Sequence, residues 1–536
     1  MARTIRICSA LALLLIPIAA EARRSEPSAL GLYIRARVAD NGNQSVQAVE
    51  SYAAALTADP GNPTIAFRAY REAVEAGNYA LAVRAAQVLE NAGDVPPDAH
   101  VLLYIATLQN RDWAAAKLRL NALSEEPGLG FLAPMFGRWL EVATRTPIVL
   151  RGAKTIDRSI NAYVAENEAL IALSTGEIDD AAVAIKGMWT LDPYRAGSLR
   201  LAAASRLFER NQKARALDLI VADDAAANNA RAMIEKGRKL GLSVTSPSEG
   251  AAFLLARVAG DLIVEGNGRS GLTVARMAEF AAPKNARIRL MVAGALAARK
   301  RHDVALAIAD GLVSDPIYGD DAASFRIEQL EGLGDVDSAL GAARDRAVNS
   351  PNDQARIGDI ELRRRNFSSA AAAYQIAVDK LGAKAEWGLI FAAGNAYDNA
   401  GNWSKARPLL ERALALAPEE PAILNELGYG LITHDEAVDH GLAYITKAVL
   451  LRPDDAAIVD SFGWAQLKRG AYAESITLLE RAVRLDQAQA EIGEHLGDAY
   501  WAAGRRIDAR YAWAAARVQA DGEALTRLDG KIAGKR

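Results

Sequence analysis

A glycine-rich loop is the segment of this sequence whose residue types most resemble a cofactor site. Residues 266–271 read Gly-Asn-Gly-Arg-Ser-Gly and match the G-x-G-x-x-G pattern. That pattern binds a dinucleotide inside a βαβ unit with an acidic residue about 20 positions further on. Here the chain runs directly into Pro283 and another helical repeat, and Gly266 and Gly271 suit an interhelix turn and a close-packing position. We therefore predict no nucleotide site and no other cofactor.

The next candidate is a histidine-containing turn. Among the five histidines, only two lie together, in the cluster His434, Asp435, Glu436, Asp439 and His440. Neither the histidine spacing nor any cysteine makes a recognised zinc pattern. Carboxylates in an interhelix turn are ordinarily solvated. The sequence thus predicts an exposed acidic turn and no metal site.

Motifs for nucleophilic or metal-assisted catalysis are absent from the sequence. It contains neither G-x-S-x-G nor H-E-x-x-H, and no segment outside the repeats described below is large enough for an active-site domain. We predict no catalytic residue and no enzyme. The alternative that stays open is a hydrolase or direct catalytic regulator whose site motifs do not reveal. A purely structural spacer is a third hypothesis.

Length and composition point to an all-helical array. A chain of 536 residues is too long for a single compact core. Alanine is abundant, aromatic residues make up only 6%, and β-branched runs bounded by turns are scarce. The net charge is −3 without any Lys/Arg block, so DNA and RNA are excluded as main partners.

The first 22 residues are typical of a secretory signal. Arg3 and Arg6 precede an apolar stretch from Ile7 to Ala20, and residues 20–22 read Ala-Glu-Ala, a small-x-small cleavage pattern. The apolar run of about 14 residues is short of the roughly 20 that a spanning helix needs. We expect cleavage after Ala22, a periplasmic mature chain and no membrane span.

The only cysteine is Cys8, at the start of the apolar run and not at its end in a lipobox. We expect no lipidation there. A mature chain that begins at Arg23 contains no cysteine, so it forms neither disulfides nor thiolate metal sites.

Internal periodicity decides the fold prediction. Half of the steps between successive small residues are 34 positions long, and the other short steps are within three of that value. These small residues are Ala48, Ala82, Ala116, Ala181, Ala216, Gly271, Ala305, Ala339, Ala370, Ala406, Gly441, Ser475 and Ala509. An apolar or aromatic residue follows four positions later, a second small residue often follows after seven, and a proline often follows after eleven or twelve.

This pattern resembles the tetratricopeptide repeat, a helix-turn-helix unit of 34 residues, over nearly all of residues 29 to 521. The best single stretch runs from Trp387 to Pro418 and carries Gly394, Tyr397, Gly401, Trp403, Ala406, Leu410 and Ala413. The resemblance implies an all-α fold, a right-handed superhelical solenoid of about 14 tandem helix pairs. The weakest units fall at 130–160 and 195–226.

The register predicts the domain organisation. After the signal peptide at 1–22, an N-terminal array of about six units spans 23–226, and an irregular insertion follows at 227–249. Residues 246–249 read Ser-Pro-Ser-Glu, which suits an N-cap, an N1 proline and an N3 glutamate that restart the array. A C-terminal array of about eight units spans 250–521, and 522–536 form a capping tail.

The C-terminal third has a narrower resemblance. Its segments at 424–429, 452–455, 459–464, 479–483 and 495–501 look like a periplasmic repeat protein widespread in proteobacteria. That group resembles an outer-membrane repeat lipoprotein that binds and activates a carboxyl-terminal-processing protease. The resemblance implies association with the outer membrane or with such a protease. This chain departs from the group in lacking a lipobox cysteine.

The first helices of stacked repeats line a concave face that binds extended peptides or helices of other proteins. Counting from repeat starts at Trp387, Pro421, Ala456 and Ala490, we predict a protein-binding set of Phe391, Asn395, Tyr429, Asp460, Trp464, Leu467, Asp498 and Trp501. The aromatic members have a second interpretation, as core residues between tightly wound neighbours.

Acidic residues add negative charge to this face, so we expect a partner peptide with basic and apolar side chains. They are Glu328, Glu331, Asp359, Asp398, Asp460, Glu494 and Asp498. Some tetratricopeptide proteins hold a terminal carboxylate with a clamp of Lys, Asn and Arg. Here Asn395 fills one clamp position, but Phe391 replaces the lysine, and Ala457 and Ser461 stand where cations are needed. We therefore predict no capture of chaperone tails.

Overall fold

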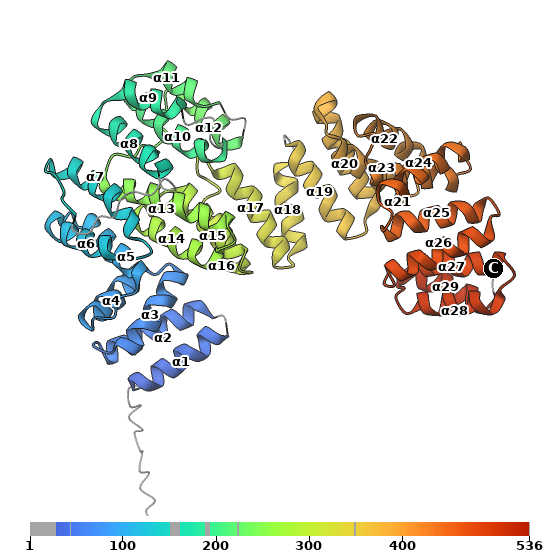
Figure 1. Ribbon diagram of the computed structural model, residues 1–536, viewed down its shortest axis with the longest axis horizontal. Coiled ribbons are helices and arrows are strands. Elements are labelled where there is room, and N and C mark those ends of the chain that lie inside the picture. The colour runs from blue at the N-terminus through green and yellow to red at the C-terminus, as the bar shows by residue number, and fades with distance from the viewer. Residues whose placement is uncertain are drawn as a thin grey trace, which may run out of the picture. The chain divides into compact units, whose positions relative to one another are not determined.

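The computed structural model describes residues 28–42, 44–150, 161–187, 193–221, 224–347 and 350–534. These residues form 29 α-helices and no β-strand (Figure 1). The predicted signal peptide at 1–22 lies outside them. Among the described residues, no helix is both long enough and apolar enough to span a membrane.

The chain divides into two compact units, Met1–Phe325 and Arg326–Arg536, called unit 1 and unit 2 below. The insertion predicted at 227–249 marks an interruption of the repeat register. The boundary between the two units is instead the place where few contacts join one part of the chain to the next. Residues 227–235 of that insertion are not irregular, because they lie in helix α12, where Ala227, Ala230 and Ile234 are buried.

Unit 1 is built mostly from consecutive helix pairs. Its helices are α1 (Ala29–Asn41), α2 (Ser45–Ala58), α3 (Pro63–Ala76), α4 (Tyr79–Asn91), α5 (Pro97–Gln109), α6 (Trp113–Glu125), α7 (Ala133–Thr144), α8 (Asn161–Thr175), α9 (Ile178–Gly187), α10 (Pro193–Glu209), α11 (Lys213–Leu219), α12 (Ala225–Glu235), α13 (Pro247–Val264), α14 (Gly268–Ala281), α15 (Ala286–Ala297) and α16 (His302–Asp310), with the 3₁₀ turn η1 (Gly130–Leu132). Helix α17 (Gly319–Gly332) crosses the unit boundary.

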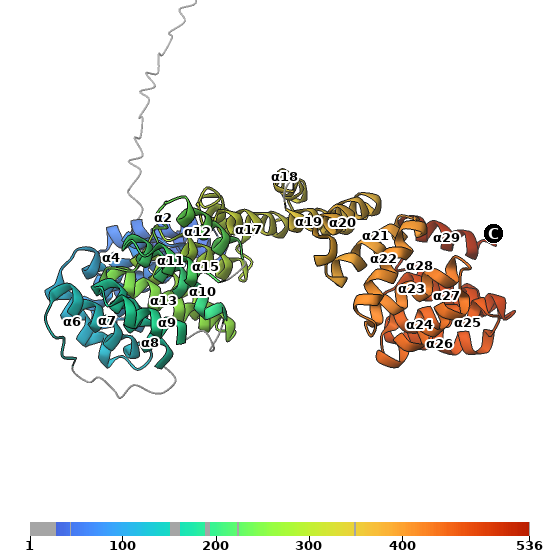
Figure 2. The same ribbon diagram turned by 90° about the horizontal axis from the view of Figure 1, so that it is seen from above.

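Unit 2 continues the same pattern of helix pairs, which Figure 2 shows from a second direction. Its helices are α18 (Val336–Arg346), α19 (Pro351–Arg363), α20 (Phe367–Leu381), α21 (Trp387–Asn399), α22 (Trp403–Leu416), α23 (Pro421–Thr433), α24 (Val438–Leu451), α25 (Ala456–Lys468), α26 (Tyr472–Leu485), α27 (Ala490–Ala502), α28 (Arg506–Arg517) and α29 (Gly522–Ile532), with the 3₁₀ turn η4 (Gly382–Lys384).

Burial confirms the repeat register. All thirteen small residues that define it are buried, because they lie where the two helices of a pair approach most closely. The residues four positions later fill the seam between the helices, as Tyr52, Tyr374 and Trp513 do. The paired, all-helical repeat architecture predicted from the sequence is therefore confirmed.

Glycines on the first helices permit this close approach. A Cβ atom built on Gly497 would lie 2.2 Å from the Trp513 ring, and one on Gly463 would lie 2.7 Å from Leu479. Where the register places Ser475 in place of alanine, its buried hydroxyl donates to the carbonyl of Gly463 at 2.8 Å. Residue size at the seam thus sets the helix spacing.

Helices α13 and α14 begin a second run of repeats that folds back on the first. The predicted N-cap is confirmed, since the Ser246 side chain and Glu249 form a reciprocal capping box with Pro247 at N1. Helix α14 contacts α3 and α5, and α13 contacts α5 and α7. Buried Arg276 on α14 donates to the carbonyl of Glu75 on α3 at 3.0 Å. In unit 1, therefore, first helices of the early repeats are covered by the same chain.

Candidate protein-binding surface

The residues predicted to bind a partner all lie on the first helices of unit 2, which stack on one another in the order α21, α23, α25 and α27. We use the name first-helix face for the exposed and half-exposed side chains of these helices and for the polar groups that lie among them. Asp460 is buried, and the other seven predicted residues are half-buried. Helix α29 stacks on α27 as a further first helix would.

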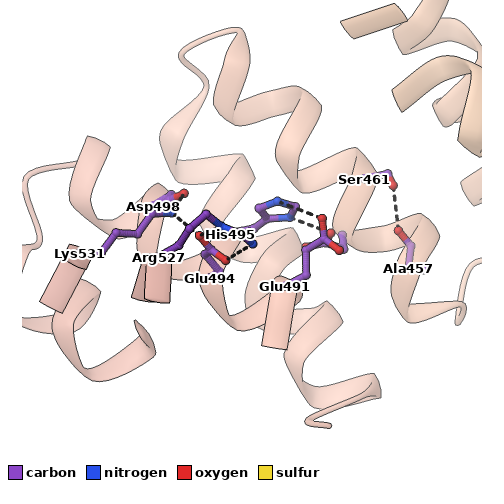
Figure 3. A network of polar contacts seen from close by, with 9 residues as sticks. Ala457, Ser461, Glu491, Glu494, His495, Asp498, Arg527 and Lys531 are labelled. Carbon is purple, nitrogen blue, oxygen red and sulfur yellow. Dashed lines mark hydrogen bonds and ion pairs between the residues drawn. The ribbon is translucent and has the colours of Figure 1, made fainter. Parts of the chain in front are cut away.

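Polar contacts link α25 to α27 and α27 to α29 across this face, and we call them the polar ladder. The fifth residue of one helix bonds to the sixth of the following one: Asp460 Oδ2 lies 2.8 Å from His495 Nδ1, and Glu494 Oε2 lies 3.1 Å from Arg527 Nη2. At the step from α23 to α25 the corresponding residues are Asn425 and Ser461. The Ser461 hydroxyl instead donates to the Ala457 carbonyl of its own helix at 3.0 Å (Figure 3), so the ladder has a gap at this step.

Three buried polar atoms on α23 and α25 have no hydrogen-bond partner in the described part of the chain. They are Asn425 Oδ1 on α23, and Asp460 Oδ1 and Trp464 Nε1 on α25. A buried polar group that lacks a partner destabilises the fold by roughly 1–3 kcal/mol, so such groups are ordinarily satisfied. Each of these atoms is itself buried, so a ligand could reach it only after the side chains around it moved.

Trp464 is held in place by groups on both α25 and α27. Its ring stacks on the His495 imidazole with centroids 4.3 Å apart, and the Lys468 ammonium lies 4.7 Å from the ring centroid. Burial disfavours the protonated form of His495, but the charge and hydrogen bond of Asp460 outweigh it, so the pKa of His495 is raised. Trp464 is thus held in place by its neighbours and is half-buried. Its indole N–H has no hydrogen-bond partner in the described structure.

The α27–α29 end of the face is fully paired. The Lys531 ammonium lies 2.7 Å from both Glu494 and Asp498, and Arg527 adds a second cation to Glu494 (Figure 3). Burial acts to raise the pKa of Glu494, but these two cations outweigh it and the pKa is lowered. Helix α29 therefore caps the array electrostatically as well as sterically.

The expectation of a generally negative face is wrong, because cations and hydroxyls of the same chain meet most of its carboxylates. The pairs are Glu328 with Arg356 at 3.0 Å, Glu331 with Arg363, Asp359 with the Tyr374 hydroxyl at 2.6 Å, Asp398 with His434 at 3.7 Å, and Glu494 and Asp498 with Lys531. Among the described residues of this face, carboxylates without an arginine or lysine partner include Asp359 on α19 and Glu426 on α23.

Glu426 on α23 is one such carboxylate. It accepts a hydrogen bond of 2.9 Å from Asn395 on α21. Burial, followed by the nearby charges of Asp398 and Glu491, raises the pKa of Glu426 to about 7. Glu426 is therefore only partly ionised at neutral pH, and its ionised form has no compensating cation in the described structure.

Replacing Glu426 by glutamine is expected to stabilise unit 2 at pH 8 and to change little at pH 4. Because the folded state binds this proton more tightly than the unfolded state, stability falls as pH rises from the unfolded pKa to about 7. The gain at pH 8 should be on the order of 2 kcal/mol. Urea unfolding followed by circular dichroism at both pH values measures it. Equal effects of Glu426→Gln at the two pH values would contradict the assignment.

The remaining predicted residues pack partly into the core. Phe391 contacts the clusters around Ile390 and Trp403, and Leu467 packs against the cluster around Leu479. The ring of Trp501 lies 5.4 Å from that of Trp513. The structure thus brings Asn395, Tyr429, Asp460 and Trp464 to the middle of the face and places Trp501 at its paired end.

Sequence reasoning missed four polar residues in the middle of the face, namely Asn425, Glu426, Glu491 and His495. A search for complementary polar residues 33 to 36 positions apart would have found the ladder, since Asp460 and His495 are 35 apart and Glu494 and Arg527 are 33 apart. Asn425 and Ser461, 36 apart, would have appeared as its missing step.

The two motifs considered for cofactors have structural roles. Residues 261–264, which precede the glycine-rich loop, lie in helix α13, Gly266 has φ +83° in the interhelix turn, and a Cβ on Gly271 would lie 2.6 Å from Ile263. In the histidine turn, Glu436 accepts from Trp403 Nε1 at 3.3 Å and pairs with Arg407 at 2.7 Å. Across the described ranges no cluster of His, Cys, Asp or Glu is arranged to hold a metal ion.

Comparison with known families identifies a repeat in unit 2. Residues 387–430 match the model "Tetratricopeptide repeat", which covers helices α21 and α22 and the start of α23. The chain is also 34% identical over 89 residues to the TPR repeat-containing protein PA4667 of Pseudomonas aeruginosa strain PAO1. That alignment covers 17% of this chain and spans only 15% of the length of the relative.

Solved structures of repeat proteins are similar at low identity. The chain matches the crystal structure of the APC/C hetero-tetramer Cut9-Hcn1 with 16% identity and a TM-score of 0.36, over 94% of this chain and 95% of that one. It matches TTC0263, a thermophilic TPR protein of Thermus thermophilus, with 18% identity and a TM-score of 0.31, over 34% of this chain and 100% of that one. At identities and scores this low, the likeness says nothing about partners or activity.

Proposed function

We propose that this chain, which carries a tetratricopeptide repeat at residues 387–430, is a scaffold that binds an extended segment of a partner protein on the first-helix face of unit 2. The observation that carries the proposal is the stack of first helices α21 to α27, which in the described structure no further helix covers except at α27 and which presents the half-buried side chains of Asn395, Tyr429 and Trp464. Amide, phenol and indole groups on neighbouring helices suit a peptide, which offers both N–H and C=O groups.

Unit 2 is favoured over unit 1 for this role because of what covers the first helices. In unit 1, α13 and α14 of the same chain lie against α3, α5 and α7. In unit 2, the first helices α21 to α27 contact one another, and α29 covers only the last of them. A partner segment therefore needs to displace no helix of unit 2.

The experiment is a selection of linear peptides from a random display library on the full-length chain. Enriched peptides should bind the purified protein in solution and compete with one another for one site. They should bind Asn425→Arg, which places a long cationic side chain on the half-buried part of α23, at least tenfold more weakly, while Thr446→Arg, at an exposed residue of α24, serves as the control. Enrichment of no peptide, or equal binding to both variants, would contradict the proposal.

The proposed partner and compartment rest on sequence features. The signal-like residues 1–22 and the narrower resemblance of the C-terminal third support a periplasmic adaptor for a protease or an envelope-assembly complex. An exported chain should begin at Arg23 when its N-terminus is sequenced, and an exported chain that begins at Met1 would rule out the cleavage. A scaffold of this kind should hydrolyse nothing when purified free of partners.

A further inference from the structure

Unit 1 contains two cavities that share three of their lining side chains. One has a volume of about 440 Å³ and lies among α10, α13, α15 and the turn before α17. The other has a volume of about 310 Å³ and lies among α10, α12 and the same turn. Ser198, Arg287 and Tyr318 line both cavities. Volumes of this order are typical of small-molecule sites, which occupy roughly 300–1,000 Å³.

Tyr318 combines a buried ring with an accessible hydroxyl. The residue is 7% exposed and packs in one cluster with Leu199 of α10 and Ala227 of α12. Its hydroxyl makes no hydrogen bond in the described structure, yet the oxygen is not sealed from solvent as the unpaired atoms of α23 and α25 are. The hydroxyl therefore faces the cavities that Tyr318 lines. Burial raises the pKa of Tyr318 to about 12, so the hydroxyl is a hydrogen-bond donor at neutral pH.

Arg287 supplies a cation close to this hydroxyl. Its charge acts more strongly on Tyr318 than any other does, and its guanidinium has no ion pair or side-chain hydrogen bond in the described part of the chain. Arg287 lies in the first turn of α15, which contains no acidic residue. Lys284 lies just before this helix and lines the larger cavity. Cations at a helix N-terminus oppose the helix dipole, whereas an anion bound there is stabilised.

Three aspartates limit the charge of the anion that fits this position, because the charges of Asp321, Asp315 and Asp224 also act on Tyr318. Each aspartate is offset in its own turn or helix. Asp315 accepts from two backbone N–H groups at 2.9 and 2.8 Å, Asp224 accepts from a backbone N–H of α12 at 2.7 Å, and Asp321 lies in the first turn of α17. Their negative charge disfavours a dianion such as phosphate more than a singly charged carboxylate.

Apolar side chains form much of the remaining walls. Leu201, Leu219 and Ile220 line the smaller cavity, and Phe253 and Ile288 line the larger one. A ligand that fits both the donors and these walls has one charged end and an apolar body.

We infer that unit 1 binds a small carboxylic acid with an alkyl chain where these two cavities share their lining. The carboxylate accepts hydrogen bonds from the Arg287 guanidinium and from the hydroxyls of Tyr318 and Ser198. The alkyl chain lies along the apolar walls of the cavities. This site is separate from the partner surface proposed for unit 2.

Octanoate is the probe, titrated calorimetrically into the full-length chain at pH 8. It should bind at one site. Octanamide, which has the same chain and a neutral head, should bind about tenfold more weakly or worse. Octyl phosphate, which carries about two negative charges at this pH, should also bind more weakly than octanoate. Failure of octanoate to bind, or equal binding of octanoate and octanamide, would overturn the inference.

Two variants test the donors. Arg287→Gln should weaken octanoate binding about tenfold or more, whereas Arg289→Gln, the same change on α15 but outside both cavities, should leave it unchanged. Tyr318→Phe keeps the buried ring and removes only the hydroxyl, so it should weaken binding roughly fivefold. Tyr79→Phe, at a half-buried tyrosine outside both cavities, is its control.

Thermal melts without ligand report whether each variant is folded. If a folded Arg287→Gln or Tyr318→Phe binds octanoate as the wild type does, the carboxylate does not lie at these donors and the inference is overturned. If a variant unfolds, the comparison of octanoate with octanamide on the wild-type chain decides.

A peptide that ends in leucine distinguishes a small molecule from the end of a protein, since it offers a carboxylate beside an apolar side chain. It should not displace octanoate, because the cavities have the volumes of a small-molecule site. If the peptide displaces octanoate and binds more tightly, the ligand is the end of a polypeptide and the inference is overturned.

Discussion

Replacing Trp513 by alanine is expected to lower the free energy of unfolding of unit 2 by about 3–5 kcal/mol. Trp513 on α28 is only 2% exposed, and its ring fills the space that Gly497 leaves on α27. Its indole N–H also donates to Asp498 at 3.1 Å. The variant therefore loses the seam of the last helix pair and a hydrogen bond, and urea unfolding followed by circular dichroism measures the loss.

The matched control for Trp513→Ala is Tyr511→Ala on the same helix. Tyr511 is 74% exposed, so removing its ring should change the unfolding free energy by less than about 0.5 kcal/mol. Equal losses for the two variants would show that the register, which places Trp513 in the seam and Tyr511 outside it, has been misassigned.

Replacing Trp464 by alanine is expected to weaken partner-peptide binding by about 1–3 kcal/mol, a factor of roughly 5 to 150. Trp464 lies half-buried on α25 in the middle of the face, so a bound segment gains contact area there. Trp501, which packs on Trp513 and carries Arg506 at 4.8 Å over its ring, should contribute less to binding. Fluorescence anisotropy with a selected peptide gives both affinities.

The unfolding free energies of Trp464→Ala and Trp501→Ala distinguish a role in binding from a role in the core. Tyr472→Ala, at an exposed aromatic residue on α26, serves as the control for loss of a ring outside the face. If Trp464→Ala and Trp501→Ala each lower stability by about 3–5 kcal/mol while the folded fraction binds the peptide unchanged, both tryptophans are core residues. That result would refute their assignment to the binding surface.

Much of the fold was predictable because its determinants are local and periodic. Ala48, Ala370 and Ala406 were placed by their spacing alone, and each is fully buried. The capping box at Ser246 and Glu249 was readable from four adjacent residues. Helix α12 was missed because its buried residues do not share the repeat spacing that revealed the other helices.

The candidate site was predictable only in part. Spacing placed Trp464 and Asp460 on one side of a first helix, because residues four apart on a helix share a face. It could not show that Asp460 bonds to His495 on the next first helix, or that Lys531 neutralises Asp498. Those contacts depend on side-chain conformations across a helix–helix interface, so most of the acidic residues that the register placed on this face proved to be paired.

What the sequence determined by itself is the repeat: helix pairs, their seams and the identity of the first helices, since 3.6-residue periodicity and small-residue spacing act within about 34 residues. Tertiary structure alone decided which polar groups remain unpaired and which first helices are covered. Asn425 is left without a donor because Ser461 bonds within its own helix. The first helices of unit 1 are covered because α13 and α14 return to them from far along the chain. Both outcomes depend on how successive repeats are placed against one another, which no single repeat encodes.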